Sequence, residues 1–216
     1  GISMSSVIIY SGGMDSSVLL YQRKADIALA VSFQYGSKHN ARELESARAN
    51  CMALGIEHKV VHLDFVADLF RSDLLQSGGS IPEGHYGDES MRSTIVPFRN
   101  GIMLSIAAGI ADSLGHDEVL IGNHSGDHAI YPDCRYGFID AMAGAIMEGT
   151  VFRIKLSAPF IGMNKRDIAL EGRRIGMDFG ATYSCYNGGP IHCGKCGTCV
   201  ERKEALAGFD TTEYMA

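Results

Sequence analysis

The chain has 216 residues, 46% of them hydrophobic and 20% charged, with a formal net charge of −6. This composition is that of an ordinary globular protein and excludes a disordered one. The acidic balance, with no run of five basic residues, gives no support for a nucleic-acid partner. No apolar run approaches the roughly 20 residues of a membrane span, and no signal-peptide pattern opens the chain, so we expect a cytoplasmic protein without a membrane partner.

The first predicted element is a strand over residues 7–10. Four successive apolar residues, "VIIY", fit a parallel strand that is buried on both faces. The polar stretch that follows predicts a turn into a helix, with Asp15 or Ser16 as the N-cap and residues 18–20 on its apolar side.

The remaining elements alternate between strands and helices. We expect strands over 25–35, 57–65, 117–123 and 152–156, and helices over 40–54, 103–114, 139–147 and 164–175. Residues 66–95 are rich in glycine without sustained periodicity, which predicts a short helix and then a lid loop. The alternation predicts a doubly wound parallel α/β sheet of five strands over 1–180, with ligands beyond the carboxyl ends of its strands.

The turn "SGGMDSS" at residues 11–17 has the features of an anion site. It joins a strand to a helix N-terminus, and Gly12 and Gly13 let an anion approach the backbone N–H groups. An ordinary turn would also use glycine, serine and aspartate. The string lacks the lysine of the P-loop and the spacing of the dinucleotide-binding fingerprint.

This string resembles the loop of pyrophosphatase-loop enzymes, which split ATP into AMP and pyrophosphate. The resemblance implies that Asp15 and Ser16 help to place the phosphates and their Mg²⁺, as catalytic residues. It also implies an ATP-binding stretch made of Tyr10, Ser11, Gly12, Gly13, Met14, Asp15, Ser16, Ser17, Val18, Leu19 and Leu20.

Four cysteines fall within fifteen residues near the end of the chain: Cys185, Cys193, Cys196 and Cys199. Two overlapping C-x-x-C pairs aim their sulfurs at one point, and a fourth cysteine completes a tetrahedron. We therefore predict one structural Zn²⁺ in residues 181–216, packed on the same domain. Disulfides fit a cytoplasmic chain less well, and an iron–sulfur cluster remains an alternative.

Four motifs together are similar to those of the 7-cyano-7-deazaguanine synthase family: "SGGMDSS", "VPFRNGIMLSIA" (96–107), "YPDCR" (131–135) and the cysteine tail. The resemblance implies an adenine nucleotide alpha hydrolase-like (HUP-type) fold, a homodimer and an ATP-dependent ligase. Its substrates would be 7-carboxy-7-deazaguanine and free ammonia, joined through an acyl-adenylate and an amide that becomes a nitrile. Phe98 stands where the family more often has glycine, and Ser17 where it has threonine.

Such chemistry needs cations for the phosphates, and Arg99 and Lys165 are our candidates because each lies beside the start of a predicted helix. Solvated surface charges are the alternative interpretation. For the substrate, an aromatic face and a carboxylate suit a guanine-like ring, which points to Tyr131 and Asp133, with Arg135 for the acid. Asp127 and His128, just before them, are further candidates.

Three other functions remain open. A paralogue of the family would attach a deazaguanine acid to a protein. A pyrophosphatase-loop enzyme that modifies tRNA would need an RNA-binding surface, which this acidic composition does not favour. A non-catalytic zinc module would have no reason to keep an intact phosphate loop.

Overall fold

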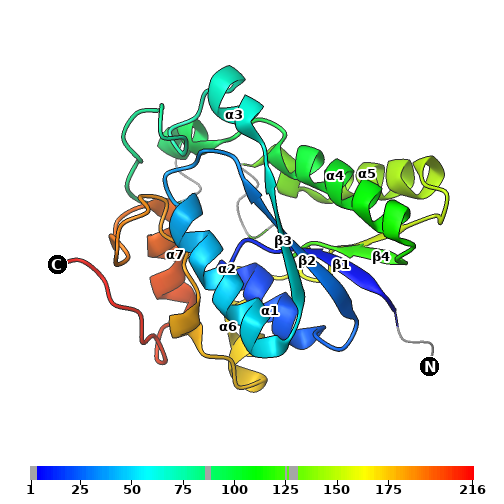
Figure 1. The fold of residues 1–216 in the computed structure, drawn as a ribbon. Helices are drawn as coiled ribbons and strands as arrows, with labels where there is room; N and C mark the ends of the chain where they lie inside the picture. The colour runs from blue at the N-terminus through cyan, green and yellow to red at the C-terminus, as the bar shows by residue number, and fades with distance from the viewer. Residues whose placement is uncertain (1–3, 86–88, 125, 127–130) are drawn as a thin grey trace.

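The computed structural model describes residues 4–85, 89–124, 126 and 131–216. Its centre is a parallel sheet of five strands in the order β3-β2-β1-β4-β5 (Figure 1). The strands are β1 (Ser6–Ile9), β2 (Ile27–Gln34), β3 (Glu57–His62), β4 (Glu118–Leu120) and β5 (Lys155–Ser157). The predicted doubly wound α/β sheet is confirmed, and its chain order reverses between β1 and β4.

Helices cover both faces of the sheet. They are α1 (Met14–Gln22), α2 (Asn40–Leu54), α3 (Asp64–Leu69), α4 (Arg99–Leu114), α5 (Tyr136–Gly149), α6 (Lys165–Arg174) and α7 (Gly197–Ala205). Figure 1 shows α4 and α5 on one side of the sheet and α1, α2 and α6 on the other. Three short 3-10 helices, Glu89–Thr94, Pro132–Cys134 and Phe179–Ala181, lie in the connections.

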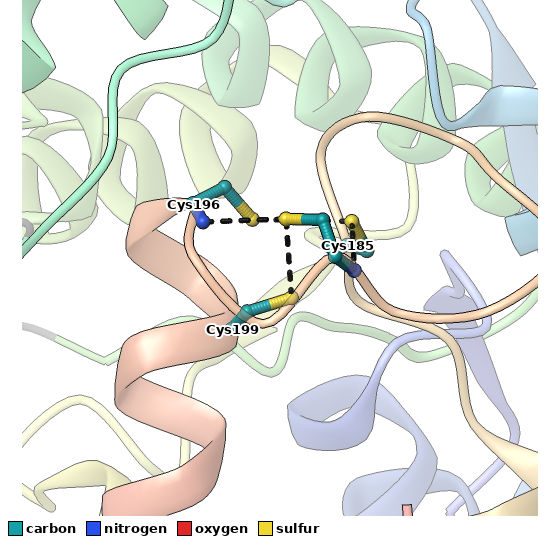
Figure 2. Close-up of side chains that lie close together, drawn as sticks. Cys185, Cys196 and Cys199 are labelled. Carbon is teal, nitrogen blue, oxygen red and sulfur yellow. Dashed lines mark hydrogen bonds between the residues drawn. The ribbon is translucent and has the colours of Figure 1, made fainter. Parts of the chain in front are cut away.

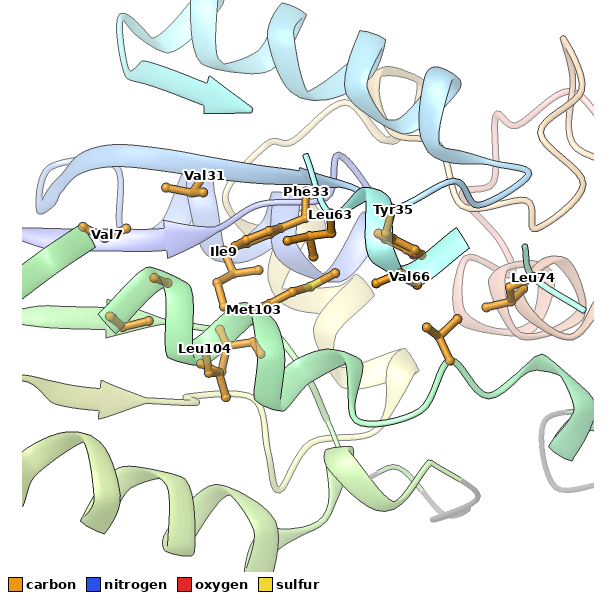
Figure 3. Close-up of a cluster of buried hydrophobic side chains, with 14 of the residues drawn as sticks. Val7, Ile9, Val31, Phe33, Tyr35, Leu63, Val66, Leu74, Met103 and Leu104 are labelled. Carbon is orange, nitrogen blue, oxygen red and sulfur yellow. The ribbon is translucent and has the colours of Figure 1, made fainter. Parts of the chain in front are cut away.

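Alternate residues of β1 enter two separate cores. Val7 and Ile9 pack in the cluster that includes Leu104 of α4 (Figure 3), whereas Ile8 packs with Val18 of α1 on the opposite face. A strand that is buried on both faces has no polar positions, which is why the sequence reads as a continuous apolar run.

Several helix boundaries follow the local signals. The αL conformation of Gly55, with φ of 66°, ends α2, and Asn164 forms a capping box with Asp167 at the start of α6. The prediction of an N-cap at Asp15 or Ser16 was wrong, because α1 begins at Met14 with Gly13 as its N-cap. The sequence analysis also missed α7, because its first residues were interpreted only as part of the cysteine motif.

The described part of segment 66–95 is tied to other loops. Lys38 Nζ donates a hydrogen bond to the carbonyl of Asp73 at 2.7 Å. The N–H of Gly84 donates to the carbonyl of Lys195 at 3.0 Å, which joins this segment to the cysteine-rich tail. Its role as a lid stays a prediction.

One stretch of the described chain, Met91–Leu114, is long and apolar enough to cross a membrane by length and composition alone, a candidate that the sequence analysis did not identify. Its helical core, α4, packs against β1 and β4 in the interior. That packing accounts for the apolar composition of α4 by its place in the core.

Candidate active site

A cavity of about 270 Å³ opens at the carboxyl ends of β1, β2 and β4. This is the switch point of the sheet, where doubly wound proteins bind their ligands. Its lining includes the turn after β1, the loop after β4, the first turns of α2, α4 and α6, and residues of the cysteine-rich tail. The fold thus brings together residues from both ends of the chain, from Ile9 to Glu201.

The turn after β1 packs tightly on α2. Gly12 has a φ of +84°, and a Cβ there would collide with the carbonyl oxygen of Glu43, so both the conformation and the space require glycine. The Oγ atoms of Ser11 and Ser16 lie 3.0 Å apart, and the N–H of Gly13 donates to Ser11 Oγ. The turn is therefore closed on itself at the N-terminus of α1, where the helix dipole attracts anions.

Part of the predicted ATP-binding stretch faces the cavity and part lies in the core. The cavity-lining members are Tyr10, Ser11, Gly13, Met14, Asp15 and Ser16. The side chains of Val18, Leu19 and Leu20 are fully buried among apolar residues, and Ser17 Oγ bonds to Tyr10 OH at 2.8 Å. Direct contact with a nucleotide is thus accessible to residues up to Ser16.

Asp15 and Lys165 form the polar group beside this turn. Lys165 Nζ lies 3.0 Å from Asp15 Oδ2, and His124 Nε2 lies 3.5 Å from the same oxygen. The other oxygen, Asp15 Oδ1, is buried without a hydrogen-bond partner among the described residues. An orphaned carboxylate oxygen on a cavity-lining residue suits a hard divalent cation.

Arg99, the first residue of α4, lies in a group of tyrosines. Its Nη1 donates to Tyr35 OH at 2.8 Å, and Tyr131 OH lies 3.3 Å from Tyr186 OH. All four residues line the cavity. The guanidinium and the aromatic faces can therefore hold a flat anionic ligand.

The residue before Arg99 carries backbone strain. Phe98 has a φ of 54° and a ψ of 28°, the left-handed conformation that glycine adopts without cost. Its ring lies against Gly101, where a Cβ would collide with it, and it makes an edge contact with Phe138 at 5.8 Å. This explains physically why glycine suits the position.

The predicted substrate residues separate in the structure. Tyr131 lines the cavity. Asp133 is buried, and its Oδ2 accepts a hydrogen bond from the N–H of Asn100 at 2.9 Å, so it supports the start of α4 and does not line the cavity. Arg135 is exposed and does not line the cavity. Asp127 and His128 lie outside the described residues.

The sequence analysis missed several cavity residues, among them the buried pair Glu43 and His39. Glu43 Oε1 lies 3.3 Å from Nε2 of His39, the N-cap of α2. Burial raises the pKa of Glu43 to about 8 against the opposing effect of Arg99, and burial with Arg99 lowers the pKa of His39 to about 3. Their spacing of four residues just after a strand is too common to have identified them.

The four cysteine sulfurs converge, as Figure 2 shows for Cys185, Cys196 and Cys199. All four Sγ atoms lie within 4.8 Å of one another, and the Cys196–Cys185 and Cys193–Cys199 pairs are at 4.0 and 3.9 Å. Four thiolates around Zn²⁺ at 2.3 Å would stand about 3.8 Å apart, so the cluster fits a tetrahedral metal. The backbone N–H groups of Cys193, Lys195 and Cys196 also donate to cluster sulfurs.

The fold and the cavity define a class: doubly wound α/β proteins with a cavity at the switch point, lined by a glycine-containing turn after the first strand. A structure described as NMN synthetase from Francisella tularensis shares the fold, with a TM-score of 0.50 and 14% identity over 88% of this chain and 70% of that one. The chain belongs to the family described as queuosine biosynthesis protein QueC, whose model matches residues 5–210.

Relatives named 7-cyano-7-deazaguanine synthase match nearly the whole chain. One from Porphyromonas gingivalis is 58% identical over 212 residues, covering 97% of this chain and 96% of that protein. One from Desulfotalea psychrophila is 52% identical over 217 residues, covering 98% and 99%. The predicted family is thus confirmed.

Proposed function

We propose that this protein is a 7-cyano-7-deazaguanine synthase, an ATP-dependent ligase that converts 7-carboxy-7-deazaguanine and ammonia to the nitrile with release of AMP and pyrophosphate. One observation carries the proposal. The cavity joins the anion-binding turn, Lys165 and Arg99 at one switch point, in a chain 58% identical to a protein of that name.

The first step activates the acid. The turn at Ser11 to Ser16 holds the outer two phosphates of ATP with its N–H groups, and Lys165 stabilises the charge that develops on the leaving pyrophosphate. An oxygen of the substrate carboxylate attacks the α-phosphorus, and the bond to pyrophosphate breaks. Mg²⁺ bound with ATP, held by Asp15, would neutralise part of the phosphate charge.

The later steps form the nitrile. Ammonia displaces AMP from the acyl-adenylate and gives the amide. A second ATP adenylates the amide oxygen, and elimination of AMP leaves the nitrile. Arg99 is suited to hold the acid or adenylate, because its guanidinium faces the same cavity as the phosphate turn.

The ring of the substrate would lie among Tyr35, Tyr131 and Tyr186. These tyrosines supply aromatic faces and hydroxyl groups that match a polar heterocycle. Asp133 and Arg135 remain weaker candidates, because one carboxylate oxygen of Asp133 is already used by Asn100.

The cysteine cluster would hold Zn²⁺ in a structural role, since four protein thiolates leave no open coordination position. The ion would fix the tail against the cavity, where Ser184, Tyr186 and Thr198 contribute to the lining. The family resemblance supports a homodimer that works in the cytoplasm, as further parts of the proposal.

The test is direct. We expect the protein with 7-carboxy-7-deazaguanine, ATP, Mg²⁺ and ammonium to give amide and then nitrile by mass spectrometry, with AMP and not ADP. Lys165→Ala is expected to slow AMP formation about 100-fold or more. The control Lys59→Ala, at a lysine 65% exposed on β3, is expected to leave it unchanged.

Two results would contradict the proposal. Formation of ADP would show that ATP is cleaved between its β- and γ-phosphates, which contradicts the pyrophosphatase-loop reaction. Formation of the adenylate without amide or nitrile, followed by transfer to a protein amine, would support the paralogue that labels proteins.

A further inference from the structure

Glu43 is a cavity carboxylate that the steps above leave without a role. Its side chain is 13% exposed and lines the cavity from the first turn of α2. Oε1 faces His39, while Oε2 lies 4.0 Å from the place that a Cβ on Gly13 would occupy. Within the described chain nothing donates a hydrogen bond to Oε2, so this oxygen is open to a donor on a ligand.

The position of Glu43 is between the two anion-binding parts of the cavity. On one side is the phosphate turn at Gly13. On the other, Tyr35 OH links Arg99 Nη1 at 2.8 Å to His39 Nε2 at 3.4 Å, and His39 contacts Glu43. In the proposed mechanism, the turn at Gly13 holds the phosphates and Arg99 holds the acid. The acyl carbon of the substrate must lie between them, which places it close to Glu43.

The surroundings give Glu43 the chemistry of a proton acceptor near neutral pH. The groups that face it are His39 at the N-cap of α2, Tyr35 after β2 and Arg99 on α4. Burial raises its pKa to about 8, and His39 beside it is neutral because burial lowers the pKa of the imidazole. A carboxylate with this pKa can take a proton from a weak acid and release it again within one turnover.

The reaction has one substrate that needs such a group. The nitrogen source is mainly ammonium at neutral pH, and ammonium has no lone pair with which to attack. Lys165 and Arg99 repel ammonium, whereas the carboxylate form of Glu43, whose population grows as pH approaches about 8, attracts it.

We propose that Glu43 binds ammonium and removes one proton from it, so that ammonia forms beside the acyl-adenylate. The inference rests on the proposed function. The proton passes to the Glu43 carboxylate, and the nitrogen lone pair forms the C–N bond. The C–O bond to the phosphate then breaks and its electron pair leaves with AMP. A second proton leaves the nitrogen to water, and Glu43 returns its proton to solvent.

The test separates adenylation from the attack of nitrogen. Glu43→Gln keeps the size of the side chain but cannot accept a proton. In single-turnover reactions with preformed adenylate, we expect amide formation from ammonium to fall about 100-fold or more. Formation of the adenylate is expected to stay within about threefold of the wild-type rate.

A neutral nucleophile provides the decisive comparison. Hydroxylamine carries its lone pair at neutral pH, so hydroxamate formation by Glu43→Gln is expected to stay within about threefold of the wild-type rate. The ammonium rate of the wild type should level off above about pH 8, while that of the variant keeps rising with free ammonia. Glu45→Gln, two residues along α2 at a side chain 70% exposed, is the matched control.

Three outcomes overturn the inference: an unchanged ammonium rate, an equal loss with hydroxylamine, or an equal loss in adenylation. The last would show that Glu43 binds the deazaguanine. If the wild-type protein itself forms no adenylate, the proposed function fails, and that result is distinct from a failure of the Glu43 variant alone.

Discussion

The cavity and the C-terminal segment 181–216 both bury polar side chains, but they differ in how many of the buried polar atoms have hydrogen-bond partners. In the C-terminal segment, Arg202 of α7 is 1% exposed and each of its three nitrogens donates a hydrogen bond. The acceptors are Thr212 Oγ1 at 2.9 Å, Ser184 Oγ at 3.0 Å and the carbonyl of Phe179 at 2.9 Å.

The cavity leaves its polar groups incomplete. Asp15 Oδ1, His39 Nδ1 and both polar atoms of the Asn123 side chain are buried without hydrogen-bond partners in the described part of the chain. Buried polar groups are nearly always paired, because an orphaned one costs about 1–3 kcal/mol. The fully hydrogen-bonded Arg202 therefore stabilises the fold, whereas the unpaired polar atoms of the cavity are available to bind ligands.

The largest expected effect comes from the metal site, on the architectural side of this comparison. Removal of a structural metal loses apparent binding free energy on the order of 10 kcal/mol, because the site does not exist in the unfolded chain. We expect Cys199→Ala to abolish binding of one metal ion per chain and to unfold the segment, measured by metal content and thermal denaturation. Cys51→Ala, at a buried cysteine away from the cluster, should keep the metal.

Arg202 gives the next largest effect. Arg202→Met keeps much of the side-chain volume but leaves three acceptors without a donor, so we expect a loss of about 3 kcal/mol in the free energy of unfolding. Chemical denaturation measures it. Arg174→Met, at an exposed arginine paired with Glu171, is expected to change stability by less than about 0.5 kcal/mol. Equal losses of stability in Arg202→Met and Arg174→Met would show that the three hydrogen bonds of Arg202 do not stabilise the C-terminal segment.

Removing the charge of Glu43 is expected to increase the free energy of unfolding, because the buried carboxylate destabilises the folded state. Its folded-state pKa of about 8 lies above the ordinary glutamate pKa of 4.5, so between these pH values the folded state holds a proton that the unfolded state has lost. Stability from this group therefore falls as pH rises from about 4.5 to about 8.

Glu43→Gln should remove this loss. We expect the variant and the wild type to be equally stable at pH 4, and the variant to be more stable by on the order of 3 kcal/mol at pH 9. Denaturant titrations across this range measure the difference, in which other titrating groups cancel. A stability difference between variant and wild type that does not change with pH would contradict the raised pKa of the buried Glu43.

The fold could be predicted from the sequence because its signals are local. The apolar run of β1, Gly55 after α2 and the Asn164–Asp167 capping box each act within a few residues. The helix α7 was missed because Cys196, its N-cap, and Cys199, in its first turn, were interpreted only as metal ligands, and its position depends on the cysteine cluster and on Arg202.

The site was predicted only where a motif was contiguous. The turn at residues 11–17 and the four cysteines are short strings whose chemistry is visible in the order of residues. Glu43 and His39 enter the cavity because β2 and α2 lie beside the phosphate turn, a tertiary relation that no local pattern records. Asp133 shows the converse: a plausible carboxylate is used by the backbone of Asn100.

The smallest expected effect tests whether the cavity also stores backbone strain. Phe98 is 57% exposed in the left-handed conformation, directly before Arg99. Phe98→Gly relieves a cost of about 1 kcal/mol but loses the edge contact with Phe138, so its stability should stay within about 1 kcal/mol of the wild type. Phe98→Ala loses the same contact and keeps the strained backbone. We therefore expect it to be less stable than Phe98→Gly by about 1 kcal/mol in chemical denaturation, whereas equal stabilities would show that the conformation before Arg99 costs nothing.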